Sequence, residues 1–229
     1  CLLAGQYLTR YYDAAEARTW LELADGCFQF QAKASKPNED CNGYQWLTLY
    51  HMMTYALARP DLTLFENGSA RLSADFAILC MDNLGYSVTY GDTGAYVGWW
   101  SEMPFLMGAA WYYRDPRYAW ALEKKQAVSG RVSMGEYNCL PTVEAAAGSG
   151  LKPPADLLGT KAWPLDPYYY KTFGGPQVQS LEQSVDKVVF RNGFDPQDQY
   201  LLLDGLSNGG HKHLDGNSIS RWSEKGRIW

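Results

Sequence analysis

Apolar residues recur at helical spacing through the first half of the chain. The pattern predicts helices over residues 13–31, 42–59, 68–83, 97–113 and 115–127. In the second of these, one face carries Tyr44, Leu47, Tyr50, His51, Tyr55 and Ala58. Helices of similar length joined by short connections are typical of a helical bundle or an α/α toroid.

The pattern changes twice in the second half. Residues 129–179 are rich in Gly, Pro, Ser and Tyr, which predicts a long interdomain crossing with little regular structure. From Val185 the apolar residues alternate in DKVVFRNGF, DQYLLLDGL and NSISRWS, and turn signals separate these runs. Alternation of this kind predicts the first strands of an antiparallel sheet.

We therefore predict an α+β multidomain chain. Residues 1–128 form the C-terminal part of an α/α toroid, residues 129–179 the crossing, and residues 180–229 the start of a truncated antiparallel β-sandwich domain. Because the chain begins with Cys1 and stops at Trp229 inside an expected strand, we expect a fragment of a longer protein.

Composition narrows the classes of partner. The net charge is −5 and Lys and Arg are not clustered, which disfavours a nucleic-acid partner. No apolar run approaches the length that spans a bilayer, so we expect no membrane insertion. The five cysteines are widely spaced without a C-x-x-C pair, which favours free thiols or at most one disulfide.

The sharpest local motif follows the expected second strand. His211, His213 and Asp215 occupy alternating positions, so in an extended segment their side chains project to the same side. Three such groups suit a catalytic cleft or the beginning of a metal site. The alternative is an exposed polar turn.

Two helix starts carry the other candidates. The loop over residues 38–46 contains Glu39, Asn42 and Tyr44 where exposed backbone N–H groups favour an anionic ligand. Its alternative is ordinary helix capping by Asp40 or Asn42. A Gly-rich loop that opens the fourth helix carries a second set of candidates: Tyr90, Asp92, Tyr96, Trp99 and Trp100. Their aromatic rings suit a carbohydrate cleft, and the alternative is packing in the hydrophobic core.

These motifs together resemble the heparinase II/III-like polysaccharide lyases, in which an α/α toroid precedes antiparallel β-sheets. The segment DGLSNGGHKHLDGNSIS is similar to that family's H-x-H-x-D-x-x-S segment. In that family, an Asn or His stands at the start of one toroid helix and a Tyr at the start of a later one, and Asn42 and Tyr96 have the same separation in the chain. Tyr90 and Tyr96 keep the aromatic spacing expected before the catalytic helix. Where the family often has an Asn-His pair, this chain has Asn42-Gly43, so Asn38, Glu39 and Tyr44 are further candidates for that role.

The resemblance implies β-elimination on a uronic-acid polymer such as alginate, a glycosaminoglycan or ulvan. Tyr96 would act as acid and possible base, His211 as the alternative base, and Asn42 with His211 would neutralise the substrate carboxylate. Glu39, Tyr44, Tyr90, Asp92, Trp99 and Trp100 would bind the substrate. No cofactor is required, although the family's metal site makes His213 a candidate ligand for a structural zinc ion whose other ligands lie outside the chain. The expected location is the periplasm or the exterior of the cell.

Two rival functions remain at this point. One is a glycoside hydrolase on the same toroid, with its acid and base drawn from Glu39, Asp40, Asp92 and Glu102. The other is a non-catalytic glycan-binding protein in which the aromatic clefts bind sugar and the two histidines are incidental.

Overall fold

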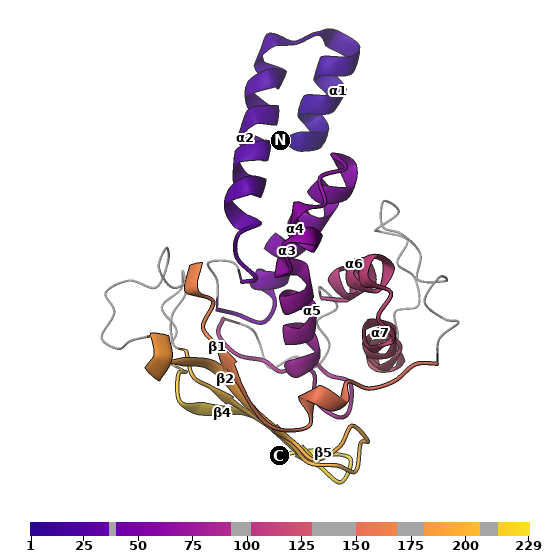
Figure 1. Ribbon diagram of the computed structural model, residues 1–229, viewed down its shortest axis with the longest axis vertical. Coiled ribbons are helices and arrows are strands. Elements are labelled where there is room, and N and C mark those ends of the chain that lie inside the picture. Colours follow the sequence, from indigo (N-terminus) through magenta and orange to yellow (C-terminus); the bar gives the residue numbers. More distant parts are fainter. Residues whose placement is uncertain (37–39, 93–101, 130–149, 169–180, 207–214) are drawn as a thin grey trace.

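The computed structural model describes residues 1–36, 40–92, 102–129, 150–168, 181–206 and 215–229. Within these ranges the chain forms seven α-helices and one five-stranded antiparallel sheet. The predicted α+β class is therefore confirmed. Figure 1 shows the sheet along one side of the molecule, with the helices on its inner face.

The helices divide into a projecting pair and a body. The pair consists of α1 and α2, which run antiparallel away from the rest of the structure (Figure 1). In the body, α5 lies over the sheet, and α6 packs against both α3 and α5. The helix bounds are Leu2–Tyr12 (α1), Ala15–Gln31 (α2), Tyr44–Ala58 (α3), Thr63–Glu66 (α4), Ser69–Leu79 (α5), Met103–Tyr113 (α6) and Pro116–Ser129 (α7).

The periodicity located most of these helices. The predictions over 13–31, 42–59 and 115–127 match α2, α3 and α7 to within about two residues. The prediction over 97–113 matches α6 from Met103, and its first residues lie outside the described ranges. The short α4 and the N-terminal α1 were missed.

One predicted helix is too long. The range 68–83 was expected, but α5 ends at Leu79. The cause is a turn in which Asp82 Oδ1 accepts hydrogen bonds from the backbone N–H groups of Leu84 and Tyr86. Gly85 supplies the left-handed backbone that this turn requires, with φ of 94°.

The sheet is a simple meander in the order β1-β2-β3-β4-β5. Its strands are Gly159–Pro164 (β1), Val185–Arg191 (β2), Tyr200–Asp204 (β3), Ser218–Glu224 (β4) and Arg227–Ile228 (β5). The alternation predicted β2, β3 and β4. Strand β1 corrects the expectation that residues 129–179 have little regular structure, since it pairs with β2 from Gly159↔Arg191 to Pro164↔Val185.

Strand β1 was hard to foresee for a physical reason. It is an edge strand, and its exposed and half-exposed side chains give no apolar alternation. It also ends in Pro164, which suits a sheet edge because proline has no N–H to donate.

Helices and sheet share one hydrophobic core. On the inner face of the sheet, Val189, Tyr200 and Leu202 are fully buried, and they belong to the same continuous cluster as Trp46 and Phe105 of the helices. The outer face is more exposed. It presents Phe190, Ile219 and Trp222, which are 37%, 61% and 44% accessible.

The C-terminal end of α5 is fastened directly to the sheet. The Tyr200 hydroxyl donates to Leu79 O at 2.8 Å, and Arg191 Nη2 donates to Met81 O at 2.6 Å. The Arg191 guanidinium also lies 4.7 Å from the centroid of the Tyr200 ring. A cation beside the last carbonyls of a helix complements the helix dipole.

Substitution of two neighbouring leucines on β3 tests whether only the inner face of the sheet is part of the core. In the 229-residue chain, Leu202→Ala should lower the free energy of unfolding by about 2–5 kcal/mol, because it removes a fully buried side chain. Leu201→Ala, on the half-exposed outer face, should cost about 1 kcal/mol. Urea denaturation measures both, and equal losses would contradict a core on one face only.

Candidate functional site

Three loops meet at the junction between the helices and the sheet. The backbone N–H of Asn42 donates to Tyr90 O at 3.2 Å, which joins the loop before α3 to the loop after α5. The backbone N–H of Gly91 donates to Asp215 Oδ2 at 2.6 Å, which joins the second loop to the segment before β4. These are the three segments that the sequence singled out, and hydrogen bonds connect them directly.

The Asn42 side chain holds this junction together. It is buried, its Nδ2 donates to Val88 O, and its Oδ1 accepts a hydrogen bond from Trp46 Nε1 at 2.7 Å. The amide therefore ties the start of α3 to the neighbouring loop. In these contacts the Asn42 side chain has a structural role, whereas the sequence predicts a role at the substrate carboxylate.

The described candidates for substrate binding differ in exposure. The Tyr90 side chain is buried, and its hydroxyl accepts a hydrogen bond from Gln45 Nε2 at 2.6 Å. Burial raises the pKa of Tyr90 well above its ordinary value, so the group is a neutral phenol. Tyr44 and Asp92, by contrast, are exposed; they follow Asn42 and Tyr90 by two residues each in the chain.

The remaining candidates lie outside the described residues. They are Asn38, Glu39, Tyr96, Trp99, Trp100, His211 and His213. Their flanks are described, since Asp40, Asp92, Glu102, Leu206 and Asp215 all have defined positions.

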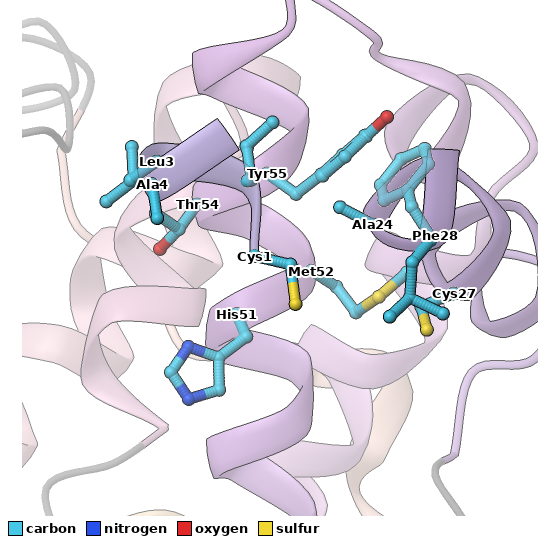
Figure 2. Close-up of a pocket in the computed structure, with 12 residues that line it drawn as sticks. Cys1, Leu3, Ala4, Ala24, Cys27, Phe28, His51, Met52, Thr54 and Tyr55 are labelled. Carbon is cyan, nitrogen blue, oxygen red and sulfur yellow. The ribbon is translucent and has the colours of Figure 1, made fainter. Parts of the chain in front are cut away.

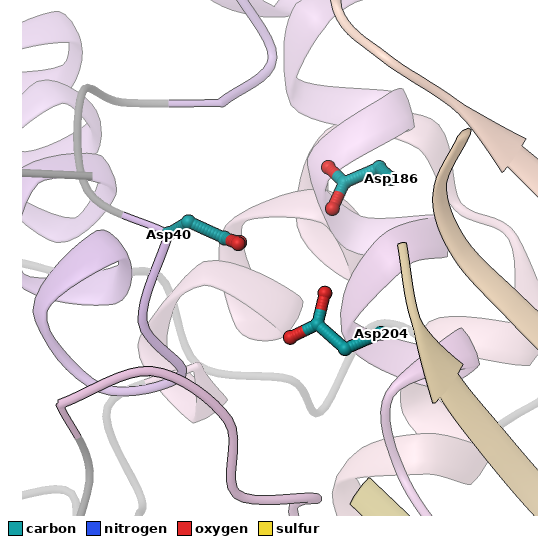
Figure 3. Close-up of side chains that lie close together, drawn as sticks. All are labelled: Asp40, Asp186 and Asp204. Atoms are coloured by element: carbon teal, nitrogen blue, oxygen red, sulfur yellow. The ribbon is translucent and has the colours of Figure 1, made fainter. Parts of the chain in front are cut away.

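A buried ion cluster lies beneath the junction and was not foreseen. Figure 3 shows Asp40, from the loop before α3, facing Asp186 and Asp204 of the sheet. Lys187 Nζ lies 3.1, 2.7 and 2.8 Å from carboxylate oxygens of Asp40, Asp186 and Asp204. Lys36 Nζ lies 2.6 Å from both Asp40 and Asp186. All five side chains are buried.

Burial and the neighbouring charges together set the pKa values of this cluster. The three carboxylates raise the pKa of Lys187 well above its ordinary value even though burial alone would lower it. Burial raises the pKa of Asp186, but the adjacent Lys187 and Lys36 outweigh burial and leave it lowered. Burial prevails at Asp204, whose pKa rises to about 6, and its Oδ2 has no hydrogen-bond partner among the described residues.

Three carboxylate oxygens of this cluster lie within 4.8 Å of one another, a spacing that a metal ion could bridge. Here the Lys187 ammonium is bonded to all three carboxylates. An ammonium group has three N–H donors, and each finds a carboxylate. Lysine thus supplies the counter-charge that a cation would bring.

A faint sequence signal for the cluster exists. Lys187, Val189 and Arg191 alternate on the inner face of β2, and Lys187 stands directly opposite Asp204 in the register with β3. Opposite charges at paired inward positions of two apolar strands indicate a buried ion pair. Finding it required the register, which the sequence did not supply.

A second buried ion pair lies near the same loops. Lys125 Nζ contacts Glu102 Oε1 at 2.6 Å and Ser87 Oγ at 2.6 Å. Both charged side chains are almost fully inaccessible. Glu102, a candidate acid for hydrolysis, is therefore held by a lysine inside the fold.

An apolar pocket lies away from these loops, between α1, α2 and α3 (Figure 2). Its volume is about 580 Å³, and its lining includes Leu3, Leu23, Cys27, Phe28, Met52 and Tyr55. None of the residues predicted for a site lines it. Among the described residues, no helix combines the length and the apolar character needed to cross a bilayer.

Comparisons of the chain with protein-family models, with curated proteins and with solved structures gave no match.

Gly91 allows the loops to approach each other. Its φ is 67°, and an added Cβ would lie 2.2 Å from Asp40 O. Gly68 has a similar φ of 86°, but nothing lies within 4 Å of its Cβ position. Gly68→Ala should therefore cost only the strain of the left-handed backbone, about 1–2 kcal/mol, whereas Gly91→Ala should cost more than about 4 kcal/mol. Urea denaturation of both variants measures this, and equal costs would contradict the close approach.

Asp204 should make stability depend on pH. Because its pKa is about 6 in the folded protein and 3.8 ordinarily, the folded state binds more protons between these values. Stability should then fall as pH rises through this window, by on the order of 3 kcal/mol. The opposite contribution of Asp186, whose pKa is lowered, lies below this window.

Chemical denaturation from about pH 4 to pH 7 tests this dependence. We expect the loss of stability between the two pKa values to be smaller in Asp204→Asn than in the unsubstituted protein. Asp75 and Asp82, whose pKa values burial also raises, keep their share of the loss in both proteins. An identical slope in both proteins would refute the assignment of the titration to Asp204.

Proposed function

We propose that this chain belongs to a polysaccharide lyase that cleaves a uronic-acid-containing polymer by β-elimination. Its helices would form part of an α/α toroid, and its sheet would begin a β-sandwich. The observation that carries this proposal is the meeting of three segments at the Asn42–Tyr90 and Gly91–Asp215 hydrogen bonds. The motifs of the family resemblance occur on these same three segments.

The proposed reaction removes the proton α to the C-6 carboxylate and expels the glycosidic oxygen at C-4. Donors must face the charge that develops on the carboxylate, because that charge opposes removal of the proton. Tyr96 would protonate the leaving oxygen, and Tyr96 or His211 would take the α proton. A tyrosine base requires a neighbour that lowers its pKa.

The described contacts refine two of these roles. Because the Asn42 side chain is bonded to Val88 and Trp46, we assign the direct contact with the substrate carboxylate to His211 and a supporting role to Asn42. Asp215 accepts from Gly91 through Oδ2, and its Oδ1 has no partner within the described residues. That oxygen suits the orientation of the His213 imidazole, whether or not His213 binds a structural zinc ion.

Burial of two carboxylates favours elimination over hydrolysis. A glycoside hydrolase needs two carboxyl groups on either side of the scissile bond. Of the four acidic candidates, Asp40 and Glu102 are buried and paired with lysines, whereas Asp92 is exposed. Of these four candidates, a hydrolase would be left with Glu39 and Asp92.

The outer face of the sheet supports the β-sandwich part of the proposal. The paired positions Phe190, Leu201 and Trp222 form an apolar row across three strands on that face. A second sheet packed on this row would bury it, as in other sandwiches. A periplasmic or secreted location accords with an extracellular polymer as substrate.

Substitution of Tyr96 tests the proposed chemistry. The full-length protein is incubated with alginate, glycosaminoglycans and ulvan while the ultraviolet absorbance of the unsaturated uronate is followed. Loss of the leaving-group acid in Tyr96→Phe should lower the rate about 100-fold or more. Tyr7→Phe, at an exposed tyrosine on α1, is the matched control and should keep full activity.

The products separate the rival functions. New reducing ends without a rise in absorbance would replace elimination by hydrolysis. Binding of a polymer without turnover would support the glycan-binding alternative. Full activity of Tyr96→Phe would remove this tyrosine from the mechanism.

A further inference from the structure

The Lys187 ammonium contacts two of the three segments that build the proposed cleft. It binds Asp40, two residues before Asn42, and it binds Asp204, the last residue of β3. The same ammonium lies 4.2 Å from the centroid of the Tyr90 ring, which belongs to the loop after α5. One buried cation is therefore in contact with two of the segments and with the strand that leads into the segment before β4.

On the helical side, backbone contacts couple the Lys187–Asp40 ion pair to the loop that carries Tyr90. The carbonyl oxygen of Asp40 lies so close to Gly91 that a Cβ there would meet it at 2.2 Å. The next contact along the loop is the hydrogen bond from Asn42 N to Tyr90 O. Movement of the Asp40 carboxylate would consequently displace the loop that carries Tyr90, Gly91 and Asp92.

On the sheet side, Asp204 holds both ends of the segment that carries His211 and Asp215. Its Oδ1 accepts from Leu206 N at 3.0 Å, and its carbonyl oxygen accepts from Asn217 N at 2.5 Å. The carboxylate of Asp204 is in turn fixed by Lys187. The base of this segment therefore has the same anchor as the helical loops.

We propose that Lys187 is a positioning residue that sets the spacing of the three cleft segments through Asp40, Asp204 and Tyr90. This inference rests on the proposed lyase function for its catalytic consequence, but its structural content stands by itself. Lys36 completes the cluster, because its ammonium donates to Asp40 Oδ1, the oxygen that Lys187 also bonds, and to Asp186 Oδ2.

Directional ionic contacts explain why charges occupy this site. Burying charges costs desolvation, and apolar residues of similar size often stabilise a fold as well or better. What an ammonium bonded to three carboxylates adds is a fixed geometry, because each N–H bond has a preferred direction. A positioning role therefore predicts that an apolar replacement can fold and still misplace the cleft.

The test uses a variant of unchanged net charge. Three aspartates and two lysines give the cluster a charge of −1, and Lys187→Met with Asp204→Asn leaves two aspartates and one lysine, also −1. Lys187→Arg is the second variant, because it keeps the charge but replaces the compact ammonium by a planar fork. Leu64→Ala, at a fully buried leucine of α4, controls for a general loss of stability.

Two readouts are measured on the full-length protein. Hydrogen exchange reports the opening of the amides of Asn42 and Gly91, which form the cleft hydrogen bonds. Steady-state kinetics on the polymer cleaved by the unsubstituted protein gives kcat and KM. For the double variant we expect exchange about tenfold faster at both amides, and kcat reduced about 100-fold with KM changed less than about threefold.

The other two variants distinguish a positioning role of Lys187 from a general loss of stability. Lys187→Arg should show the same two changes to a smaller extent, and Leu64→Ala should leave kcat unchanged. Native exchange at Asn42 and Gly91 in both Lys187 variants would overturn the inference. If the unsubstituted protein cleaves no polymer, the proposed function fails, and the exchange data alone still decide whether Lys187 positions these loops.

Discussion

The structure depends on one buried ammonium group bonded to three carboxylates. Lys187 reaches from β2 to Asp40 of the helical part and to Asp204 of the neighbouring strand. Removing one partner of such a cluster leaves an uncompensated buried charge, which costs far more than the loss of a surface ion pair. The helices and the sheet are therefore held together at this point by charge as well as by their shared apolar core.

The inner face of the sheet combines these two kinds of contact in adjacent rows. Val189 and Leu202 form an apolar row, with Lys187 opposite Asp204 on one side and Arg191 opposite Tyr200 on the other. The apolar row packs under the helices, while Arg191 and Tyr200 bind carbonyls at the end of α5. Polar anchors on both sides of an apolar centre fix the position of the sheet, because apolar contact alone is non-directional.

Periodicity and turn residues predicted the elements whose own sequence carries an apolar pattern. The helices around Tyr44–Ala58 and Pro116–Ser129 and the strand Val185–Arg191 all have an apolar pattern of their own. Strand β1 has none, since its side chains stay largely exposed, and the end of α5 is set by the Asp82 turn. The ion cluster could not be predicted because its members are far apart in sequence and meet only through register and packing.

A crystal structure of the full-length Tyr96→Phe protein with a uronic-acid oligosaccharide bound would test the proposed cleft most directly. We predict that a uronate ring lies at the junction, between the Tyr90–Asp92 loop and the segment that contains His211, with its carboxylate facing that histidine. An oligosaccharide bound elsewhere, such as along the helices that line the apolar pocket, with the junction closed to sugar, would contradict it.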